Sequence, residues 1–355
     1  MATIEDVAAR AKVGIGTVSR VLNDSPQVRP ATRAKVLQAM HELNYTPLRP
    51  AKTSRKRSHQ SIAVLVPFFD QPAAYQRLRG IVGQLQPHGF EIVLMNVEST
   101  RQARDHLMEL PQRRDIDGLI IISLPLTDEN GGRLAAARFP TVLVDTQHPA
   151  LASIVIDDYA GGRMATSHLL DLGHERIAFI GEPRHNPFGF YSSGHRENGY
   201  RQAMDAAGLD IPPRYLKFGP HHSPTARSLA IELLALPDPP TAIVAASDVQ
   251  ALGVLEAASA TGRTVPEDIS LIGYDDIDFS SYVGLTTIRQ PLFLSGVRGA
   301  EVLVGALANE GSRPLTEQLS IELIVRATTA PITSTRLAPE QNGRATTPVQ
   351  GKVEQ

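Results

Sequence analysis

Two hydroxyl side chains and an arginine are grouped in the segment Ile15–Leu22, whose sequence is IGTVSRVL. Thr17, Ser19 and Arg20 are polar, whereas the valines and the leucine recur at the spacing of one apolar helix face. A short helix of this kind turns hydroxyl and guanidinium groups outward, where they can hydrogen-bond phosphate oxygens and base edges. This arrangement suits non-covalent recognition of DNA.

This segment is expected to be the second helix of a small helical domain. Residues 3–11 form a first helix, which Thr3 can cap while Asp6 returns the hydrogen bond. Its apolar face comprises Ile4, Val7, Ala8 and Ala11. A turn at 12–14 precedes the second helix, and a third helix is predicted over 31–43. The buried stripe of the third helix is predicted to be Val36, Leu37, Met40 and Leu43. Because any small helical hairpin shows such a pattern, spacing alone leaves DNA binding open.

Length and composition indicate a soluble globular protein. A chain of 355 residues is long enough for two or three domains, and 42% hydrophobic residues are enough for sizeable cores. The absence of cysteine excludes disulfides, thiolate metal sites and cysteine nucleophiles. No apolar run approaches the roughly 20 residues of a membrane span, and the N-terminus lacks a hydrophobic signal core. We therefore expect a cytoplasmic protein without a membrane partner.

Charge is distributed unevenly along the chain. Residues 1–60 hold eleven lysines or arginines and four acidic residues, whereas the remainder holds 24 and 33. A basic head on an acidic body favours a polyanion partner for the head alone. The alternative is that basic segments merely keep the protein soluble.

Composition changes again along the rest of the chain. Residues 47–60 are rich in lysine and arginine, lack acids and contain Pro47 and Pro50, as is typical of a linker. From residue 61 to 330, short apolar runs alternate with helical stretches, which predicts repeated βαβ units with parallel sheets in two α/β lobes and a cleft between them. The strands are predicted at 62–68, 91–97, 118–123, 141–145, 153–157, 176–181, 215–218, 241–247, 269–275, 285–288 and 319–326. Residues 331–355 are polar and aperiodic and are expected to be disordered.

The chain resembles the LacI/GalR family of bacterial transcription regulators. In the first fifty residues the resemblance rests on DVA at 6–8, TVSRVLN at 17–23 and ELNYTP at 42–47. In the body it rests on GHERIAFIG at 173–181, HRENGYRQAM at 195–204, SDVQALG at 247–253, VPEDISLIGYDD at 265–276 and LTTIRQP at 285–291. The resemblance implies an N-terminal all-α helix-turn-helix head and an α/β two-lobed effector domain similar to periplasmic binding proteins.

The function that this resemblance implies is regulation of transcription. We expect a repressor that binds a pseudo-palindromic, double-stranded DNA operator as a homodimer. A small-molecule effector in the interlobe cleft, a saccharide by family precedent, would control it. A nucleobase-type corepressor is the alternative effector, and a solute-binding receptor without DNA function is the alternative class. The basic head and the missing signal peptide argue against the receptor.

The resemblance also assigns candidate DNA-binding residues. It places base specificity on Ile15 and Gly16, with Arg20 as the strongest candidate for a bidentate bond to guanine. Phosphate or backbone contacts are expected from Thr17, Ser19, Asn23, Arg29, Tyr45, Arg49 and Lys52. Ser54 stands where the family has a leucine that enters the minor groove, so a kink made by an apolar wedge is not expected.

Arg196 and Asp275 match the family residues that bind effector hydroxyls. A guanidinium fork and two carboxylate oxygens suit a vicinal diol, although each residue could instead form a simple surface ion pair. Further candidates are Phe68, Phe69, Tyr75, Asp157, His221, Ser247 and Asp248. The aromatic residues could stack on a sugar ring or merely close the core of the first lobe. His221 and His222 could bind a metal, but a solvated loop is favoured, so neither metal nor cofactor is expected.

Catalysis is not expected from this sequence. It contains no G-x-S-x-G elbow, H-E-x-x-H motif, phosphate-binding P-loop or G-x-G-x-x-G motif after a strand.

Overall fold

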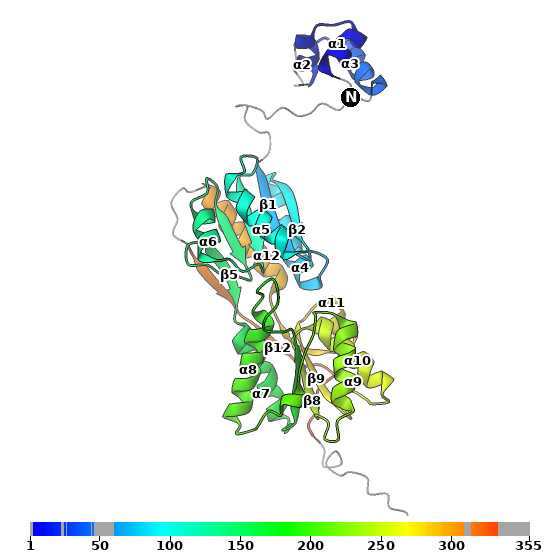
Figure 1. Cartoon of the computed structure of the whole chain (residues 1–355), viewed down its shortest axis with the longest axis vertical. Helices are drawn as coiled ribbons and strands as arrows, with labels where there is room; N and C mark the ends of the chain where they lie inside the picture. The colour runs from blue at the N-terminus through cyan, green and yellow to red at the C-terminus, as the bar shows by residue number, and fades with distance from the viewer. Residues whose placement is uncertain are drawn as a thin grey trace, which may run out of the picture. The chain divides into compact units, whose positions relative to one another are not determined.

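The structure is a computed structural model that describes residues 3–22, 25, 27–43, 45, 60–308 and 314–332 (Figure 1). The chain divides into two compact units, residues 1–58 and 59–355. The predictions for Asn23, Arg49, Lys52, the linker 47–59 and the tail 333–355 lie outside the described residues. No helix within the described ranges has the length and apolar character needed to cross a membrane.

The N-terminal unit is a three-helix domain. Its helices are α1 (Ile4–Ala11), α2 (Ile15–Leu22) and α3 (Pro30–Glu42). The predicted cap of α1 is confirmed: the Asp6 N–H donates to Thr3 Oγ1 over 3.3 Å, and the Thr3 N–H donates to Asp6 Oδ2 over 2.7 Å. Its buried core consists of Val7, Ala8, Ala11, Val18, Val21, Val36 and Ala39.

One predicted core residue of α3 is wrong. Leu37 is 51% exposed, and Ala39 is buried in its place. Val36, Ala39, Met40 and Leu43 are spaced i, i+3, i+4 and i+7 and therefore share a helix face, whereas Leu37 is rotated about 100° from Val36. The helical period of 3.6 residues per turn therefore explains why Ala39 is buried and Leu37 is exposed.

The second unit contains two six-stranded sheets. The first has the order β11-β5-β4-β3-β1-β2 and the second the order β12-β10-β9-β8-β6-β7. The strands of the first sheet are β1 (Ser61–Pro67), β2 (Glu91–Val97), β3 (Gly118–Ile122), β4 (Thr141–Val144), β5 (Ala152–Ile156) and β11 (Thr316–Leu319). Those of the second are β6 (Ile177–Gly181), β7 (Leu216–Phe218), β8 (Ala242–Ala245), β9 (Ser270–Asp275), β10 (Thr286–Arg289) and β12 (Glu322–Ile324).

Helices cover both faces of each sheet. In the first lobe, α4 (Pro72–Leu85) and α12 (Leu292–Ala308) bury one face, and α5 (Thr100–Glu109) and α6 (Asp128–Ala135) bury the other. In the second lobe, α7 (Asp158–Asp171) and α8 (Ser192–Ala206) lie opposite α9 (Ser223–Leu234) and α10 (Asp248–Ala260). The remaining elements are α11 (Asp278–Tyr282) and the short 3₁₀ helices at Gln86–His88, Leu110–Gln112 and Pro213–Tyr215. Every residue of β1, β3 and β9 is buried, as expected for strands covered on both faces.

The last predicted strand, 319–326, is wrong as a single element. The structure divides this region between the lobes: β11 pairs in parallel with β5, and β12 pairs antiparallel with β10. The chain also passes between the lobes after β5 and after β10. Three connecting segments therefore join the lobes, and the apolar run contributes to both sheets because it crosses between them.

The strand orders place a binding site at one end of each sheet. β1 lies between β2 and β3, and β6 lies between β7 and β8. The next two strands along the chain therefore lie on opposite sides of β1, and the same holds for β6. Ligands bind outside the carboxyl ends of parallel strands at such points. The non-glycine residues Phe68, Ser123, Asp145 and Asp275 have φ of +47°, +54°, +63° and +115° at the ends of β1, β3, β4 and β9. Such left-handed backbone conformations concentrate at functional sites.

Candidate functional site

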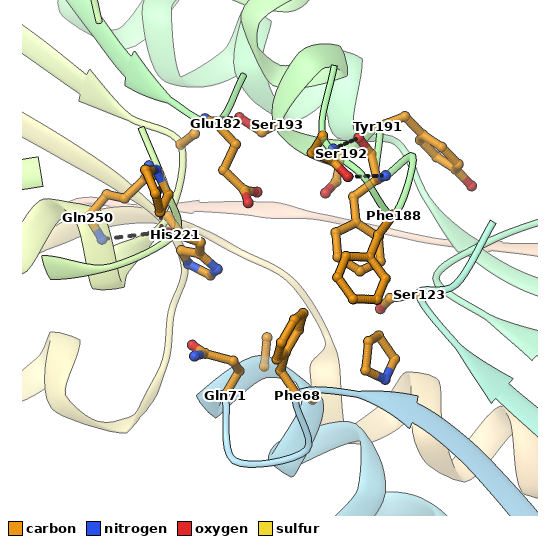
Figure 2. A pocket seen from close by; sticks show the side chains of 18 of the residues that line it. Phe68, Gln71, Ser123, Glu182, Phe188, Tyr191, Ser192, Ser193, His221 and Gln250 are labelled. Atoms are coloured by element: carbon orange, nitrogen blue, oxygen red, sulfur yellow. Dashed lines mark hydrogen bonds between the residues drawn. The ribbon is translucent and has the colours of Figure 1, made fainter. Parts of the chain in front are cut away.

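A cavity of about 600 Å³ lies between the lobes of the second unit. Its walls come from the carboxyl ends of strands in both lobes, together with α4, α8 and the segment 182–193. Figure 2 shows side chains of both lobes facing this space. The volume lies within the range of about 300–1,000 Å³ that is usual for small-molecule sites.

Arg196 is fixed in the wall by contacts on several sides. Its Nε donates to Asp158 Oδ1 over 2.8 Å, and its Nη1 donates to the Ala246 carbonyl over 2.6 Å. Nη1 also lies 3.7 Å from Asp275 Oδ1, and the guanidinium carbon lies 3.7 Å from the centre of the Tyr274 ring. Burial alone would lower the pKa of Arg196, but attraction by Asp158 and Asp275 outweighs it and raises that pKa. The guanidinium is therefore a permanent, pre-oriented donor.

Close packing of α7 on α8 positions this arginine. A Cβ on Gly162 of α7 would lie 2.1 Å from the Arg196 carbonyl oxygen, and one on Gly199 of α8 would lie 2.1 Å from the Tyr159 carbonyl oxygen. Only glycine allows the two backbones to approach so closely. The approach brings Asp158, the first residue of α7, within hydrogen-bond distance of Arg196 on α8.

A chain of polar contacts continues from Asp275 into the first lobe. Gln290 Nε2 donates to Asp275 Oδ1 over 2.5 Å, and Arg77 Nη2 donates to Gln290 Oε1 over 3.1 Å. Arg77 Nη2 lies 2.8 Å from Asp145 Oδ1, whose other oxygen accepts a bond of 2.6 Å from the Ser123 hydroxyl. The floor of the cavity is thus one connected network that joins the lobes.

Aromatic side chains form a second wall. The rings of Phe68 and Phe188 meet edge to face with centroids 5.2 Å apart, and Phe188 stacks on Phe190 at 5.1 Å. Phe188 and Phe190 belong to the second lobe but pack against the core of the first. The Asn186 side chain closes their turn, since Nδ2 donates to the Phe190 carbonyl over 2.6 Å and Oδ1 accepts from the Phe190 N–H over 3.0 Å. This turn, 186–190, therefore bridges the lobes beside the cavity.

Two polar side chains point toward the middle of the cavity. Figure 2 shows the Glu182 carboxylate and the His221 ring directed into the space, with Gln71 and Phe68 opposite. His221 Nε2 is buried and has no hydrogen-bond partner among the described residues. Burial first, and then repulsion by Arg196, lower the pKa of His221, although attraction by Glu182 opposes the shift. The imidazole is therefore expected to be neutral near pH 7.

Five of the predicted effector residues line this cavity, namely Phe68, Arg196, His221, Ser247 and Asp275. The structure places Phe69, Tyr75, Asp157 and Asp248 outside it. Phe69 and Tyr75 are 40% and 51% exposed. Asp157 instead caps α7, because its Oδ1 accepts a bond of 2.8 Å from the Ala160 N–H.

Asp248 has a structural position beneath the cavity. Its carboxylate accepts bonds from the Ser280 hydroxyl at 2.6 Å, the Thr287 hydroxyl at 2.7 Å and the Ile277 N–H at 3.1 Å. Burial, followed by repulsion from Asp275, raises the pKa of Asp248 to about 7. The side chain thus fixes the residues after β9 and the start of β10 rather than facing a ligand.

The sequence interpretation did not identify several residues of the wall, notably Arg77, Ser123, Asp145, Glu182 and Gln290. Ser123, Asp145 and Glu182 each directly follow a buried and mainly apolar strand, and Gln290 directly follows β10, whose sequence is TTIR. Strand ends were therefore the signal that could have found them. Arg77 lies inside α4 and is 3% exposed, and no local pattern separates it from a surface arginine.

The N-terminal unit presents α2 as an open surface within that unit. Ile15 is 49% exposed, Arg20 is exposed, and a Cβ added to Gly16 would meet nothing within 4 Å. Thr17 and Ser19 are partly buried. Tyr45 is partly buried and packs against the core of the domain.

Two further candidates, Arg29 and His222, lie next to helix starts. Exposed Arg29 precedes α3 without a side-chain cap, and its carbonyl accepts from the Thr32 and Arg33 N–H groups. His222 Nδ1 lies 3.0 Å from the Thr225 hydroxyl oxygen. No cluster of three or more potential metal ligands occurs in the described ranges.

Comparison with known protein families identifies both units. Residues 3–47 match the model described as bacterial regulatory proteins, lacI family, and residues 166–329 match that of a periplasmic binding protein-like domain. These matches and the two α/β sheets confirm the predicted fold class.

Several characterised proteins are similar over nearly the whole chain. The transcriptional regulator CelR of Thermobifida fusca is 34% identical over 91% of this chain and 97% of its own length. The transcriptional repressor CytR of Escherichia coli K12 is 31% identical, covering 92% of this chain and 96% of its own length. The ribose operon repressor of Bacillus subtilis is also 31% identical, with coverage of 93% and 99%.

Solved structures agree with this similarity. A complex of CelR with cellobiose superposes with a TM-score of 0.67 at 33% identity, covering 92% of this chain and all of the other. The lac repressor dimer bound to operator and the anti-inducer ONPF gives a TM-score of 0.68 at 29% identity, with coverage of 93% and 99%. The similarity spans head and body together.

Proposed function

This chain belongs to the LacI family of bacterial regulatory proteins, and from that premise we propose that it is a transcriptional repressor controlled by a saccharide. The repressor binds a pseudo-palindromic operator as a homodimer and acts in the cytoplasm. The saccharide occupies the interlobe cavity. We propose no catalytic activity.

The proposal for the head rests on α2. Its outward positions combine an open glycine, an exposed isoleucine and an exposed arginine, which suits contact with thymine methyl groups and guanine edges. The hydroxyl groups of Thr17 and Ser19 contact phosphates and thereby set the orientation of the helix in this proposal. Two such heads in a dimer read half-sites about one helical turn apart or a multiple of it.

The observation that carries the effector proposal is the connected polar floor beside an aromatic wall. Arg196, Asp275 and Asp145 offer charged donors and acceptors to hydroxyl groups, and Phe68 offers an apolar surface to the face of a sugar ring. Similarity to a cellobiose-bound regulator and to a ribose operon repressor supports a saccharide. A ligand that contacts both lobes shifts their relative position, and coupling of about 1–3 kcal/mol to DNA binding is typical.

The DNA-binding part is tested by selecting duplexes from a random library and titrating the selected sequence at two salt concentrations. We expect a pseudo-palindromic site and salt-dependent affinity. Arg20→Ala should lose about 1–3 kcal/mol of discrimination at one base pair in each half-site. Arg101→Ala, whose side chain in the second unit is 87% exposed, serves as the matched control. Absence of any preference over random DNA would refute the proposal.

The effector part is tested by thermal shift with neutral mono- and disaccharides and, as the competing class, nucleobases. A ligand at 100 times its Kd should add about 2.7 kcal/mol of stability. Asp275→Asn should abolish the shift while the fold is retained by circular dichroism. Adding the same ligand to the DNA titration then gives the sign of the response. Stabilisation by nucleobases alone would overturn the saccharide assignment.

A further inference from the structure

The two inward-pointing side chains of the second lobe, Glu182 and His221, have no structural task that accounts for their direction. Glu182 directly follows β6 and His221 precedes α9. The Glu182 N–H is bonded to the Ser193 hydroxyl over 2.8 Å, but its carboxylate forms no hydrogen bond or ion pair with any residue that the structure describes. His221 Nε2 is equally unpartnered within those ranges and is buried. Both groups face the cavity centre (Figure 2).

The other charged groups of the inner wall are already paired. Arg77 is paired with Asp145, and Arg196 lies between Asp158 and Asp275. Among the residues that the structure describes, no lysine lines the cavity, and each arginine of its wall has an acidic partner. Glu182 is therefore a carboxylate without a matching cation.

The protonation of the buried acids does not reverse this balance. Burial raises the pKa of both Asp158 and Asp275. If one of them held a proton, Arg196 would still have one aspartate as its counter-ion. Glu182 would remain unmatched, and a ligand anion would find no free cation. Of the remaining ionisable side chains of the wall, His185 and His222 are exposed at its surface, and burial raises the pKa of Tyr191, so that its hydroxyl stays uncharged.

We infer that Glu182 and His221 select the charge of the effector: the cavity accepts an uncharged ligand whose hydroxyl groups bond to them, and it excludes phosphorylated and carboxylated sugars. The Glu182 carboxylate accepts a hydrogen bond from a hydroxyl group of the ligand, and His221 Nε2 forms a hydrogen bond with a neighbouring oxygen of the same ligand. An anionic substituent there would meet a like charge in a partly desolvated space, where repulsion is stronger than in water. This inference rests on the proposed function and narrows the class of its ligand.

Isothermal titration calorimetry with matched ligands tests this selection on the full-length chain. The pairs are glucose with glucose 6-phosphate and with glucuronate, ribose with ribose 5-phosphate, and cellobiose with cellobionate. For a pair whose neutral member binds, we expect the anionic member to bind at least about tenfold more weakly, equivalent to about 1.4 kcal/mol. In the Glu182→Gln variant, the affinity for the neutral member should exceed that for the anionic member by about threefold or less.

Glu175→Gln is the matched control, because Glu175 is an exposed glutamate of the same lobe that does not line the cavity. It should leave the ratio unchanged. His221→Asn should weaken binding of the neutral ligand, while the affinity for the neutral member stays more than about fivefold above that for the anionic member, since the Glu182 carboxylate remains.

The possible outcomes distinguish a failure of this inference from a failure of the proposed saccharide effector. Equal or tighter binding of an anionic member to the wild-type chain would overturn the charge selection and leave a saccharide effector intact. An unchanged ratio in Glu182→Gln would equally overturn the role of Glu182. Failure of every sugar, neutral or anionic, to bind would refute the saccharide effector itself and this inference with it.

Discussion

Two glycines of the same helix should respond in opposite ways to the same substitution. Gly199 and Gly194 both lie in α8, the helix that carries Arg196. A methyl group on Gly199 would lie 2.1 Å from the Tyr159 carbonyl oxygen and 2.6 Å from the Arg163 amide nitrogen, both in α7. A methyl group on Gly194 would meet nothing within 4 Å.

The magnitude follows from these distances. Ordinary contact needs 3.4–4 Å, so Gly199→Ala must separate α7 from α8 by about 1 Å or more in a close-packed interior. Overpacking of this kind costs typically 1–3 kcal/mol. The same separation stretches the 2.8 Å bond between Arg196 and Asp158, which joins these helices. We therefore expect effector affinity to fall at least about tenfold, or about 1.4 kcal/mol.

Gly194→Ala should instead stabilise the protein. Alanine replaces glycine in a helix with a gain of roughly 0.5–1 kcal/mol when nothing obstructs the methyl group. Effector affinity should stay within about twofold of the wild type, because the α7–α8 separation is unchanged. Melting temperature and calorimetric Kd measured on both variants check the pair. Equal changes in the two variants, or wild-type affinity in Gly199→Ala, would refute the argument that close helix packing positions Arg196.

Gly16→Ala should keep the fold of the head, since its Cβ meets nothing, and should change base preference at the operator position beneath it, which competition among single-base operator variants would detect. Because the pKa of Asp248 is raised from 3.8 to about 7, the native state keeps a proton that the unfolded chain releases. Stability from this group should therefore fall as pH rises from about 4 to 7, and urea unfolding should show a flatter pH dependence in Asp248→Asn. Phe188→Ala should lower the melting temperature by removing an interlobe contact, whereas unchanged stability and effector affinity would show that the 186–190 turn does not join the lobes.

Local patterns predicted the elements better than the side chains that line the cavity. Apolar runs such as residues 62–66 mark a strand buried on both faces, and the T-x-x-D pattern at Thr3 and Asp6 marks a helix start, because both follow from short-range geometry. The same rules fail for Leu37, because a shift of one residue along a helix decides whether a side chain faces the core or the solvent. They fail for 319–326, where crossing between lobes depends on the whole topology.

The cavity shows the same limit more strongly. Arg196 and Asp275 were predicted from the family resemblance, yet Arg77 is 213 positions from Gln290 and meets it only because three connecting segments close the two lobes on one another. Asp157 directly follows β5, and Asp248 is the first residue of α10, just after β8. Asp157 is bonded to the start of α7 and Asp248 to two hydroxyl groups that are distant in the sequence, and neither lines the cavity. Residue type and position therefore predict that a carboxylate lies near the end of a strand. They do not predict which donor groups of the protein already bind that carboxylate.

The interlobe network gives the effector a physical means of acting on the whole body. Arg77 reaches Asp145 within the first lobe and Gln290 at the end of β10, and Gln290 in turn holds Asp275 of the second lobe. A ligand hydroxyl that donates to one acceptor of this network changes the hydrogen-bond partners available to the neighbouring side chain, because each buried polar group needs a hydrogen-bond partner. Binding energy is thereby converted into a preference for one lobe arrangement, without any contact between ligand and DNA. Within this network, the buried Nε of Arg77 has no hydrogen-bond partner among the described residues, so it is a donor that a ligand oxygen can satisfy.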